Sequence, residues 1–157
     1  MSSISLRQYY PSDLEAMFRL DEICFSEDFR FDRNSMRLFA EASNAQVLIA
    51  ECADGQLAGF AIVHTEYASD GRYGYLVTLD VAPEHRRKGL AARMMAALDR
   101  QMQFSGASRI ELHVSPDNTA ALRFYQKCGY LPAGRQVGFY GPGKDALGFW
   151  KPMGTIN

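Results

Sequence analysis

The chain has 157 residues, of which 47% are hydrophobic and 22% are charged, and its formal net charge is −1. These values are typical of one globular domain, and a charge so near zero excludes long-range attraction to nucleic acid or anionic membranes. No run of about 18 apolar residues predicts a membrane span, and the N-terminus lacks the basic-then-apolar order of a signal peptide. We therefore expect a single domain over residues 1–157 in the cytoplasm, without a membrane partner.

The three cysteines, Cys24, Cys52 and Cys128, are odd in number and lie far apart, with no Cys-x-x-Cys pair. This spacing argues against a disulfide framework and against a structural zinc site, so no metal is expected. Each cysteine stands in an apolar stretch, which predicts three buried and reduced thiols that pack like small hydrophobic side chains.

The first quarter of the chain predicts one strand and two helices. Ser5–Gln8 alternates between polar and apolar residues, which is typical of a short strand. Pro11-Ser12-Asp13 then opens a helix whose apolar residues recur at helical spacing as far as about Cys24. A second short helix is expected over residues 36–39, with a polar N-cap at Asn34 or Ser35.

From residue 46 the apolar period changes to two, which predicts strands. Tight turns are expected at Asp54-Gly55 and at residues 69–71. They separate three successive strands: Val47–Cys52, Leu57–Thr65 and Tyr73–Val81. Gly59 stands near the start of the second of these strands, where it predicts a bulge or the close approach of another backbone.

The remainder of the chain alternates helices and strands. The expected elements are the helices Gly89–Ser105 and Asn118–Cys128, and the strands Arg109–Val114, Tyr130–Val137 and Ala146–Lys151. Gly106 and Gly129 are the expected C-caps of the two helices. The order of elements predicts the α/β class, with a mixed sheet and helices on both faces. The strands Tyr73–Val81 and Arg109–Val114 should be parallel, since a helix joins them.

The turn before the long helix carries the strongest chemical signal. A helix N-terminus has unpaired N–H groups and about half a positive charge, so it binds phosphate readily. Gly89 and the small Ala91 allow close approach, and three cations precede the helix: Arg86, Arg87 and Lys88. This combination predicts a site for a pyrophosphate and a further phosphate, and a solvated basic loop is the alternative. A Walker-type ATP site is excluded, because Leu90 after Gly89 supplies neither the lysine nor the hydroxyl of that motif.

The pattern Arg86-x-x-Gly89-x-Ala91 resembles the coenzyme A pyrophosphate loop of the GNAT acetyltransferase superfamily. The preceding residues 79–83 also resemble the segment that leads into this loop in that family. The stretch from Asn118 to Tyr130 resembles a helix of that family, with Asn, Ala, Tyr and Gly at matching spacing. Within the superfamily the chain looks most like the bacterial ribosomal-protein alanine N-acetyltransferases. That likeness rests on two segments: Ile110–Val114, and Tyr140 with the later Asp145-Ala146.

The resemblance implies the GNAT fold, in which the strands Tyr73–Val81 and Arg109–Val114 splay apart and acetyl-CoA lies in the gap. Unpaired backbone groups of Leu79 and Val81 would then bond the pantetheine arm, and the Val81 N–H would polarise the thioester. Asn118 would cap its helix and also bond the arm. The complete expected set of coenzyme A contacts is Leu79, Val81, Arg86, Arg87, Lys88, Gly89, Leu90, Ala91, Ala92 and Asn118.

Direct transfer of an acetyl group to an amine needs a base for the amine and an acid for the departing thiolate. The resemblance makes Glu111 the candidate base and Tyr125 the candidate acid; the structural alternatives are an exposed strand carboxylate and a core aromatic. His113 shares the strand face of Glu111, so it is a candidate second base or acceptor contact. His85 is expected in the loop near the phosphates, and His64 is expected to be structural.

The acceptor is expected to meet a face rich in aromatic and acidic residues, formed by Phe25–Phe31, Tyr67–Tyr75 and Phe139–Pro142. A protein N-terminal amine is the first expectation, and a small amine such as a polyamine, amino acid or aminoglycoside is the second. The alternative from another class is a non-catalytic acyl-CoA sensor, which the presence of both Glu111 and Tyr125 disfavours. Nucleic-acid binding is not expected, because residues 86–88 are the only basic cluster. The chain should be a monomer or a homodimer.

Overall fold

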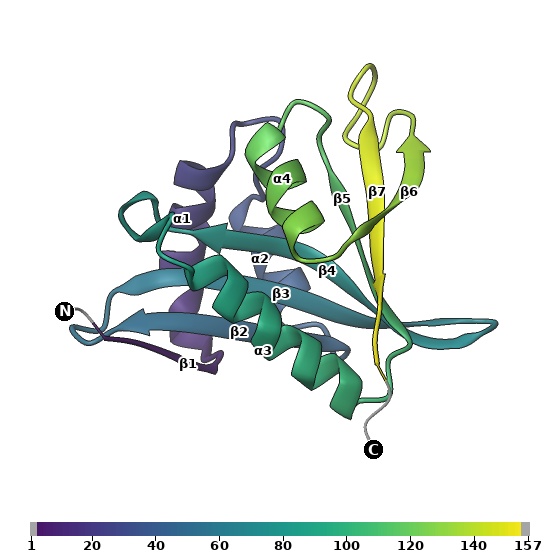
Figure 1. Cartoon of the computed structure of the whole chain (residues 1–157). Coiled ribbons are helices and arrows are strands. Elements are labelled where there is room, and N and C mark those ends of the chain that lie inside the picture. Colours follow the sequence, from purple (N-terminus) through teal and green to yellow (C-terminus); the bar gives the residue numbers. More distant parts are fainter. Residues whose placement is uncertain (1–2, 155–157) are drawn as a thin grey trace. The chain divides into compact units, whose positions relative to one another are not determined.

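The computed structural model describes residues 3–154, and Figure 1 shows its elements. The strands are β1 (Ile4–Gln8), β2 (Ala45–Cys52), β3 (Leu57–Ala68), β4 (Gly71–Val81), β5 (Arg109–Val114), β6 (Leu131–Gln136) and β7 (Ala146–Pro152). The α-helices are α1 (Leu14–Cys24), α2 (Arg33–Ala40), α3 (Leu90–Phe104) and α4 (Thr119–Lys127). Short 3-10 turns, Pro11–Asp13 and Pro83–His85, precede α1 and α3. This order of elements confirms the predicted one.

The seven strands follow the order β1-β2-β3-β4-β5-β7-β6 in one mixed sheet. Most of the recorded pairs are antiparallel, whereas β4 and β5 run parallel, as predicted. Among the described residues, β4 and β5 pair at two positions, Gly74 with Ile110 and Tyr75 with Glu111. Because β4 continues to Val81 beyond this short overlap, the pairing agrees with the predicted splay.

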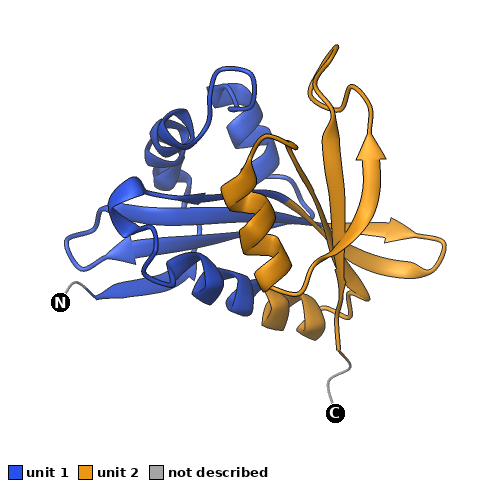
Figure 2. Cartoon of the chain, turned by 45° about the horizontal axis from the view of Figure 1, so that its top comes forward, with its two compact units in different colours: residues 1–64, 77–98 blue, residues 65–76, 99–157 orange. Residues whose placement is uncertain are grey.

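The chain divides into two compact units, coloured separately in Figure 2. The first comprises Met1–His64 and Val77–Leu98, and the second comprises Thr65–Leu76 and Asp99–Asn157. The first unit therefore holds α1, α2, β1, β2 and the beginning of α3, whereas the second holds β5, α4, β6 and β7. β3, β4 and α3 each contribute residues to both units.

The core of the first unit packs α1 and α2 against one face of its strands. Met17 and Leu20 of α1 and Met36 of α2 are buried together with Ile49, Phe60 and Ile62 of the strands. Figure 1 shows α1 and α2 behind β1–β3, and the first turns of α3 in front of them. Helices therefore cover both faces of this part of the sheet, as the alternating strand pattern predicts.

Gly59 fulfils both expectations drawn from its place in β3. The register between β2 and β3 shifts beside Ala50, which pairs with Gly59, so the strand bulges there. A Cβ atom at Gly59 would lie only 2.7 Å from the carbonyl oxygen of Asp80, on β4. The glycine is therefore required by the close approach of the β3 and β4 backbones, next to the turn that leads into α3.

The structure corrects the expected N-cap of α2 and the expected end of β3. The N-cap of α2 is Asp32, whose carboxylate accepts a 2.7 Å hydrogen bond from the Ser35 N–H; neither Asn34 nor Ser35 caps the helix. All three residues have suitable side chains, so composition alone does not select among them. β3 continues three residues past the predicted end at Thr65, to Ala68.

The cysteines are free, as predicted, but the expected full burial of Cys24, Cys52 and Cys128 is wrong, because all three are partly exposed. Each stands at the end of an element: Cys24 ends α1, Cys52 ends β2, and Cys128 is the C-cap of α4, where Gly129 was expected. Element ends lie near the surface, so an apolar neighbourhood in the sequence does not ensure burial there. Over residues 3–154, no helix combines the length and the apolar character needed to cross a membrane.

Candidate functional site

The turn before α3 exposes backbone N–H groups. The first hydrogen bond of the helix runs from the Arg93 N–H to the Gly89 carbonyl, so the N–H groups just before Arg93 have no partner inside the helix. Gly89 has a φ of +82°, and Arg87, with a φ of +62°, is the only non-glycine residue of the described chain with positive φ. Such left-handed positions turn successive N–H groups toward one side, which forms an anion-binding concavity.

The space above this turn is open. A Cβ atom at Gly89 would meet nothing within 4 Å, so the glycine answers a backbone requirement and not a crowded neighbour. The side chains of Arg87 and Lys88 are exposed, as is Ala92, while Leu90 is buried and Ala91 is half-buried. The turn is therefore anchored by one apolar side chain and otherwise faces solvent, as a phosphate site requires.

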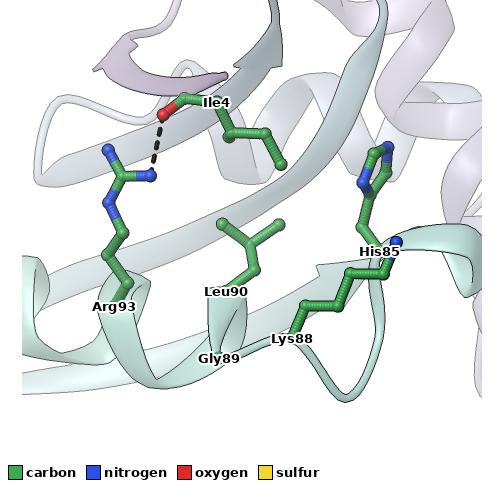
Figure 3. A pocket seen from close by; sticks show the side chains of 6 residues that line it. All are labelled: Ile4, His85, Lys88, Gly89, Leu90 and Arg93. Carbon is green, nitrogen blue, oxygen red and sulfur yellow. Dashed lines mark hydrogen bonds between the residues drawn. The ribbon is translucent and has the colours of Figure 1, made fainter. Parts of the chain in front are cut away.

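A cavity of about 220 Å³ adjoins the turn, and Figure 3 shows the side chains around it. Its lining is Ile4, His85, Lys88, Gly89, Leu90 and Arg93. Arg93 donates a 2.7 Å hydrogen bond to the carbonyl of Ile4, which holds its guanidinium at one side of the cavity. Arg93 is not among the site residues predicted from the sequence, although its place one turn after Gly89 was a usable signal.

Lys88 and His85 also line the cavity, and Figure 3 shows both of them on the side away from Arg93. His85 Nε2 lies 3.4 Å from the Sγ of Cys52. The cations of Lys88 and Arg93 and the unpaired N–H groups thus surround a space of suitable size for phosphate groups. This fits the sequence-based placement of His85 and Lys88 near a pyrophosphate.

Arg86 lies elsewhere, against the end of β4. Its Nε donates to the Val81 carbonyl at 3.0 Å, and its Nη2 contacts the Cys24 Sγ at 3.4 Å. The guanidinium would have to leave both partners to bind a phosphate. Leu79 and Val81 alternate with buried residues on β4 and are half-buried, so they share one side of the strand.

In the second unit, Glu111 is held in an ion pair. Arg109 Nε donates to Glu111 Oε2 at 2.6 Å, and Arg109 Nη1 donates to Asp70 at 2.9 Å. The guanidinium also lies over the Tyr73 ring, 4.5 Å from its centroid. The candidate base is therefore one member of a small charged network and not an isolated carboxylate in an apolar strand.

His113 lies two residues further along the same face of β5. Its Nδ1 is 2.7 Å from the Tyr75 hydroxyl, and its ring stacks on Phe139 at a centroid distance of 4.2 Å. Burial lowers the pKa of His113, although a hydrogen bond with the Gln136 side chain and the charge of Glu111 oppose this effect. The imidazole is therefore neutral near neutral pH, while burial raises the pKa of the Tyr75 phenol and keeps it protonated.

The Tyr75–His113 pair was not predicted as a unit. Its signal in the sequence is weak, because the two residues are far apart and come together only through the register in which Tyr75 pairs with Glu111. Aromatic residues of two predicted acceptor segments, Tyr67–Tyr75 and Phe139–Pro142, meet around His113, since Tyr75 bonds it and Phe139 stacks on it.

Tyr125 and Asn118 belong to α4. Tyr125 is buried, and its ring makes edge contacts with Phe124 and Tyr130 at 5.1 and 5.5 Å. The Asn118 side chain accepts a 3.1 Å hydrogen bond from the Ala121 N–H, which confirms its predicted role as the N-cap. His64 bonds the Phe39 carbonyl at 2.8 Å, so its expected structural role is confirmed as well.

Comparisons with known proteins agree with this arrangement. The acetyltransferase (GNAT) family matches residues 14–130. The catalytic subunit NAA10 of the N-terminal acetyltransferase A complex of Arabidopsis thaliana is 30% identical over 153 residues, which cover 96% of this chain and 78% of that protein.

Solved structures are similar in fold. Arabidopsis thaliana NAA60 in complex with a bisubstrate analogue superposes with a TM-score of 0.83 at 21% identity, covering 98% of this chain and 100% of that one. The ribosomal-protein-S18-alanine N-acetyltransferase of Escherichia coli gives a TM-score of 0.80 at 21% identity, covering 100% and 97%. The family match and the NAA10 relative confirm the predicted acyltransferase at the level of the family. Because the family match spans more than half of the chain, the protein belongs to the acetyltransferase (GNAT) family.

Proposed function

We propose that this acetyltransferase transfers the acetyl group of acetyl-CoA directly to the N-terminal amine of a protein or peptide. The single observation that carries the proposal is the neutral His113, hydrogen bonded to Tyr75 and stacked on the Phe139 ring. A peptide amine must lose a proton before it attacks, and a neutral imidazole behind a phenol can take that proton. The name of the related NAA10 protein supports a protein N-terminus as the acceptor.

In this proposal the turn before α3 binds the phosphates of the co-substrate. The backbone N–H groups of residues 87–92 hold the pyrophosphate, and Lys88 with Arg93 supplies positive charge beside it. Leu79 and Val81 bond the pantetheine arm through their backbones, and Asn118 adds a contact from the start of α4. Arg86 contributes once its side chain leaves the Val81 carbonyl.

Tyr75 and His113 move the proton of the amine. The Tyr75 oxygen accepts the proton, directly or through water, while its own proton passes to Nδ1 of His113 over 2.7 Å. The hydrogen bond between His113 and the Gln136 side chain fixes the ring meanwhile. Tyr125 protonates the departing thiolate. Glu111 is the second candidate base, acting from within its ion pair with Arg109.

The test is a thiol-release assay with acetyl-CoA and a panel of amines. The panel pairs peptides that have free N-termini with the same peptides blocked by an acetyl group, and adds spermidine and an amino acid amide. Thiol release with free peptides alone supports the proposal. Release with the small amines alone would move the acceptor to the second predicted class. Tight acetyl-CoA binding without release to any amine would favour the acyl-CoA sensor. Cytoplasmic location and a monomeric or homodimeric state stay predictions of the sequence.

A further inference from the structure

Two carboxylic acids lie side by side in the interior of the first unit. Asp21, in the last part of α1, has an exposed fraction of 0%, and Asp80, near the end of β4, has one of 1%. The two side chains are hydrogen bonded to each other. Neither belongs to the set of groups expected to touch acetyl-CoA or the amine. A pair of buried acids is costly unless its polar atoms are satisfied, so the pair needs an explanation.

The hydrogen-bond partners of the four carboxyl oxygens explain how this buried pair is tolerated. Asp80 Oδ1 accepts from the Thr78 hydroxyl at 2.5 Å, and Asp21 Oδ2 accepts from the Phe31 N–H at 2.7 Å. Among the described residues, no group donates a hydrogen bond to Asp21 Oδ1 or to Asp80 Oδ2. Two ionised carboxylates would leave these oxygens unpaired and facing a like charge, whereas one proton between them satisfies both.

The surroundings indicate which acid carries the proton. Burial, and then the hydrogen bond and charge of Asp21, raise the pKa of Asp80 well above its ordinary value. Burial also raises the pKa of Asp21, but the hydrogen bonds from Asp80 and from the Phe31 N–H oppose it. Asp80 therefore carries the proton and donates a hydrogen bond to the ionised carboxylate of Asp21.

The other charged or titratable groups that face the pair come from three segments. Arg86, in the turn before α3, lowers the pKa of Asp80 through its charge. Arg30 and Glu22 act on Asp21 with opposite signs. Cys24 lies near Asp80 with its thiol protonated, because burial raises its pKa to about 11. None of them donates a hydrogen bond to the two unpaired oxygens.

The hydrogen-bonded chain joins three parts of the first unit. It runs from Thr78 and Asp80 on β4, through Asp21 on α1, to the backbone of Phe31. Phe31 ends the segment Phe25–Phe31, and its ring packs against Phe39 of α2 at 5.1 Å. The position of this segment therefore depends in part on the hydrogen bond that the Phe31 N–H donates to Asp21.

We propose that Asp21 and Asp80 share one proton, and that this proton positions the segment Phe25–Phe31 as a wall of the acceptor site. The second half rests on the proposed function, because only that function makes the segment acceptor-facing. When the proton leaves, two adjacent negative charges repel each other and Asp21 withdraws from the Phe31 N–H. The anchoring is present at low and neutral pH and is lost as the pH rises through the point at which the pair becomes doubly ionised.

Hydrogen exchange tests the shared proton of Asp21 and Asp80 without any substrate. The protection of the Phe31 amide in the whole protein should fall about tenfold for each pH unit above the loss of the shared proton. In D80N the amide N–H replaces the proton toward Asp21, and the amide oxygen still accepts from Thr78. The protection in D80N should therefore not change with pH. D80A, which supplies no donor, should lower the protection at every pH.

A second measurement keeps the inference testable if a variant fails to fold. The carboxyl carbon shifts of the unmodified protein report each ionisation by NMR. One carboxyl should titrate far above the ordinary Asp value of about 3.9. Two carboxyls that both titrate at or below about pH 4, or identical pH dependence of Phe31 protection in the unmodified protein and D80N, would overturn the shared proton.

Steady-state kinetics test whether the shared proton positions the segment Phe25–Phe31 at the acceptor site. The KM for the peptide should rise in alkaline buffer for the unmodified protein but not for D80N, while kcat at neutral pH stays the same in both. If the protection of the Phe31 amide changes with pH as expected but the KM for the peptide does not, the shared proton is confirmed and its role in the acceptor site is wrong. If no amine is acetylated at all, the exchange and NMR results still decide the proton pair, so its failure is distinguishable from that of the proposed function.

Discussion

The turn before α3 and the exposed face of β5 offer different kinds of chemical group. The turn offers backbone N–H groups, arranged by positive φ at Arg87 and Gly89. The face of β5 offers side chains that are bonded to other side chains, Tyr75 to His113 and Arg109 to Glu111. A site of backbone groups follows from local glycine spacing, whereas a site of paired side chains exists only once strands have found their register.

The difference also predicts how each region responds to substitution. A backbone site depends on conformation, so a change that preserves the local φ leaves it intact. A side-chain site depends on individual atoms that take part in proton transfer, so removal of one nitrogen or one hydroxyl affects the rate directly. Substitutions in the two regions should therefore separate into effects on acetyl-CoA binding and effects on turnover.

The largest effect is expected at the Tyr75–His113 pair. His113→Gln removes the proton acceptor, and Tyr75→Phe removes the hydroxyl that bonds it at 2.7 Å. Each should lower kcat by about a hundredfold, the lower end of general acid–base contributions, with little change in KM for acetyl-CoA. Steady-state kinetics with a free-N-terminal peptide measure both quantities.

His64→Gln is the matched control, because His64 also makes one hydrogen bond, which it donates to a backbone carbonyl. It should leave kcat unchanged once the fraction of folded protein is equal. A drop in kcat of the same size in His64→Gln would show that loss of any partly buried histidine slows the enzyme, and the special role of His113 would be lost.

The next effect is expected at Gly89. An alanine there meets no neighbour, but a φ of +82° costs a residue with a Cβ about 1–2 kcal/mol, so the turn relaxes and acetyl-CoA must restore it. Gly89→Ala should therefore raise the KM for acetyl-CoA by about tenfold, with kcat nearly unchanged.

Gly55→Ala supplies the control for this prediction. Gly55 has a φ of +88° and equally open surroundings, but it lies in the hairpin between β2 and β3. The two variants should lose similar stability in thermal unfolding, yet only Gly89→Ala should change the KM. Equal KM values in the two variants would contradict a phosphate role for the turn.

The order of the elements and the glycine turn before α3 could be predicted from the sequence, because both follow from local patterns. The bounds of β5 were predicted as the structure has them, and Gly59 was recognised from its position alone. Asp32 was missed as the cap of α2 because three neighbouring polar residues satisfy the same rule.

The contacts of the candidate site were less predictable. The ion pair of Glu111 with Arg109 is local, two residues apart, but its extension to Asp70 depends on the β3–β4 hairpin. The bonds from Arg93 to Ile4 and from Tyr75 to His113 join residues 89 and 38 positions apart. No local pattern specifies such partners, since they follow from strand order and register.

A smaller effect is expected at Glu111. If His113 is the base, Glu111→Gln removes only a nearby negative charge and should lower kcat by a few-fold, well below the general-base range. Arg109→Met, which leaves the carboxylate without its partner at 2.6 Å, is the matching variant. A fall of about a hundredfold in Glu111→Gln, greatest at low pH, would instead identify Glu111 as the base, as the sequence resemblance predicts.

The smallest effect concerns pH and distinguishes the two candidate bases in the unmodified enzyme. Because burial lowers the pKa of His113, its imidazole stays neutral at pH values where an exposed histidine, with a pKa of about 6.5, is already half protonated. As the pH falls, kcat/KM for the peptide, corrected for the fraction of unprotonated amine, should hold its plateau to below about pH 6.5 and then decline. The decline should disappear in His113→Gln and persist in Glu111→Gln. A decline centred at or above about pH 6.5 would contradict proton transfer to His113, because protonation would then follow a group whose pKa is not lowered.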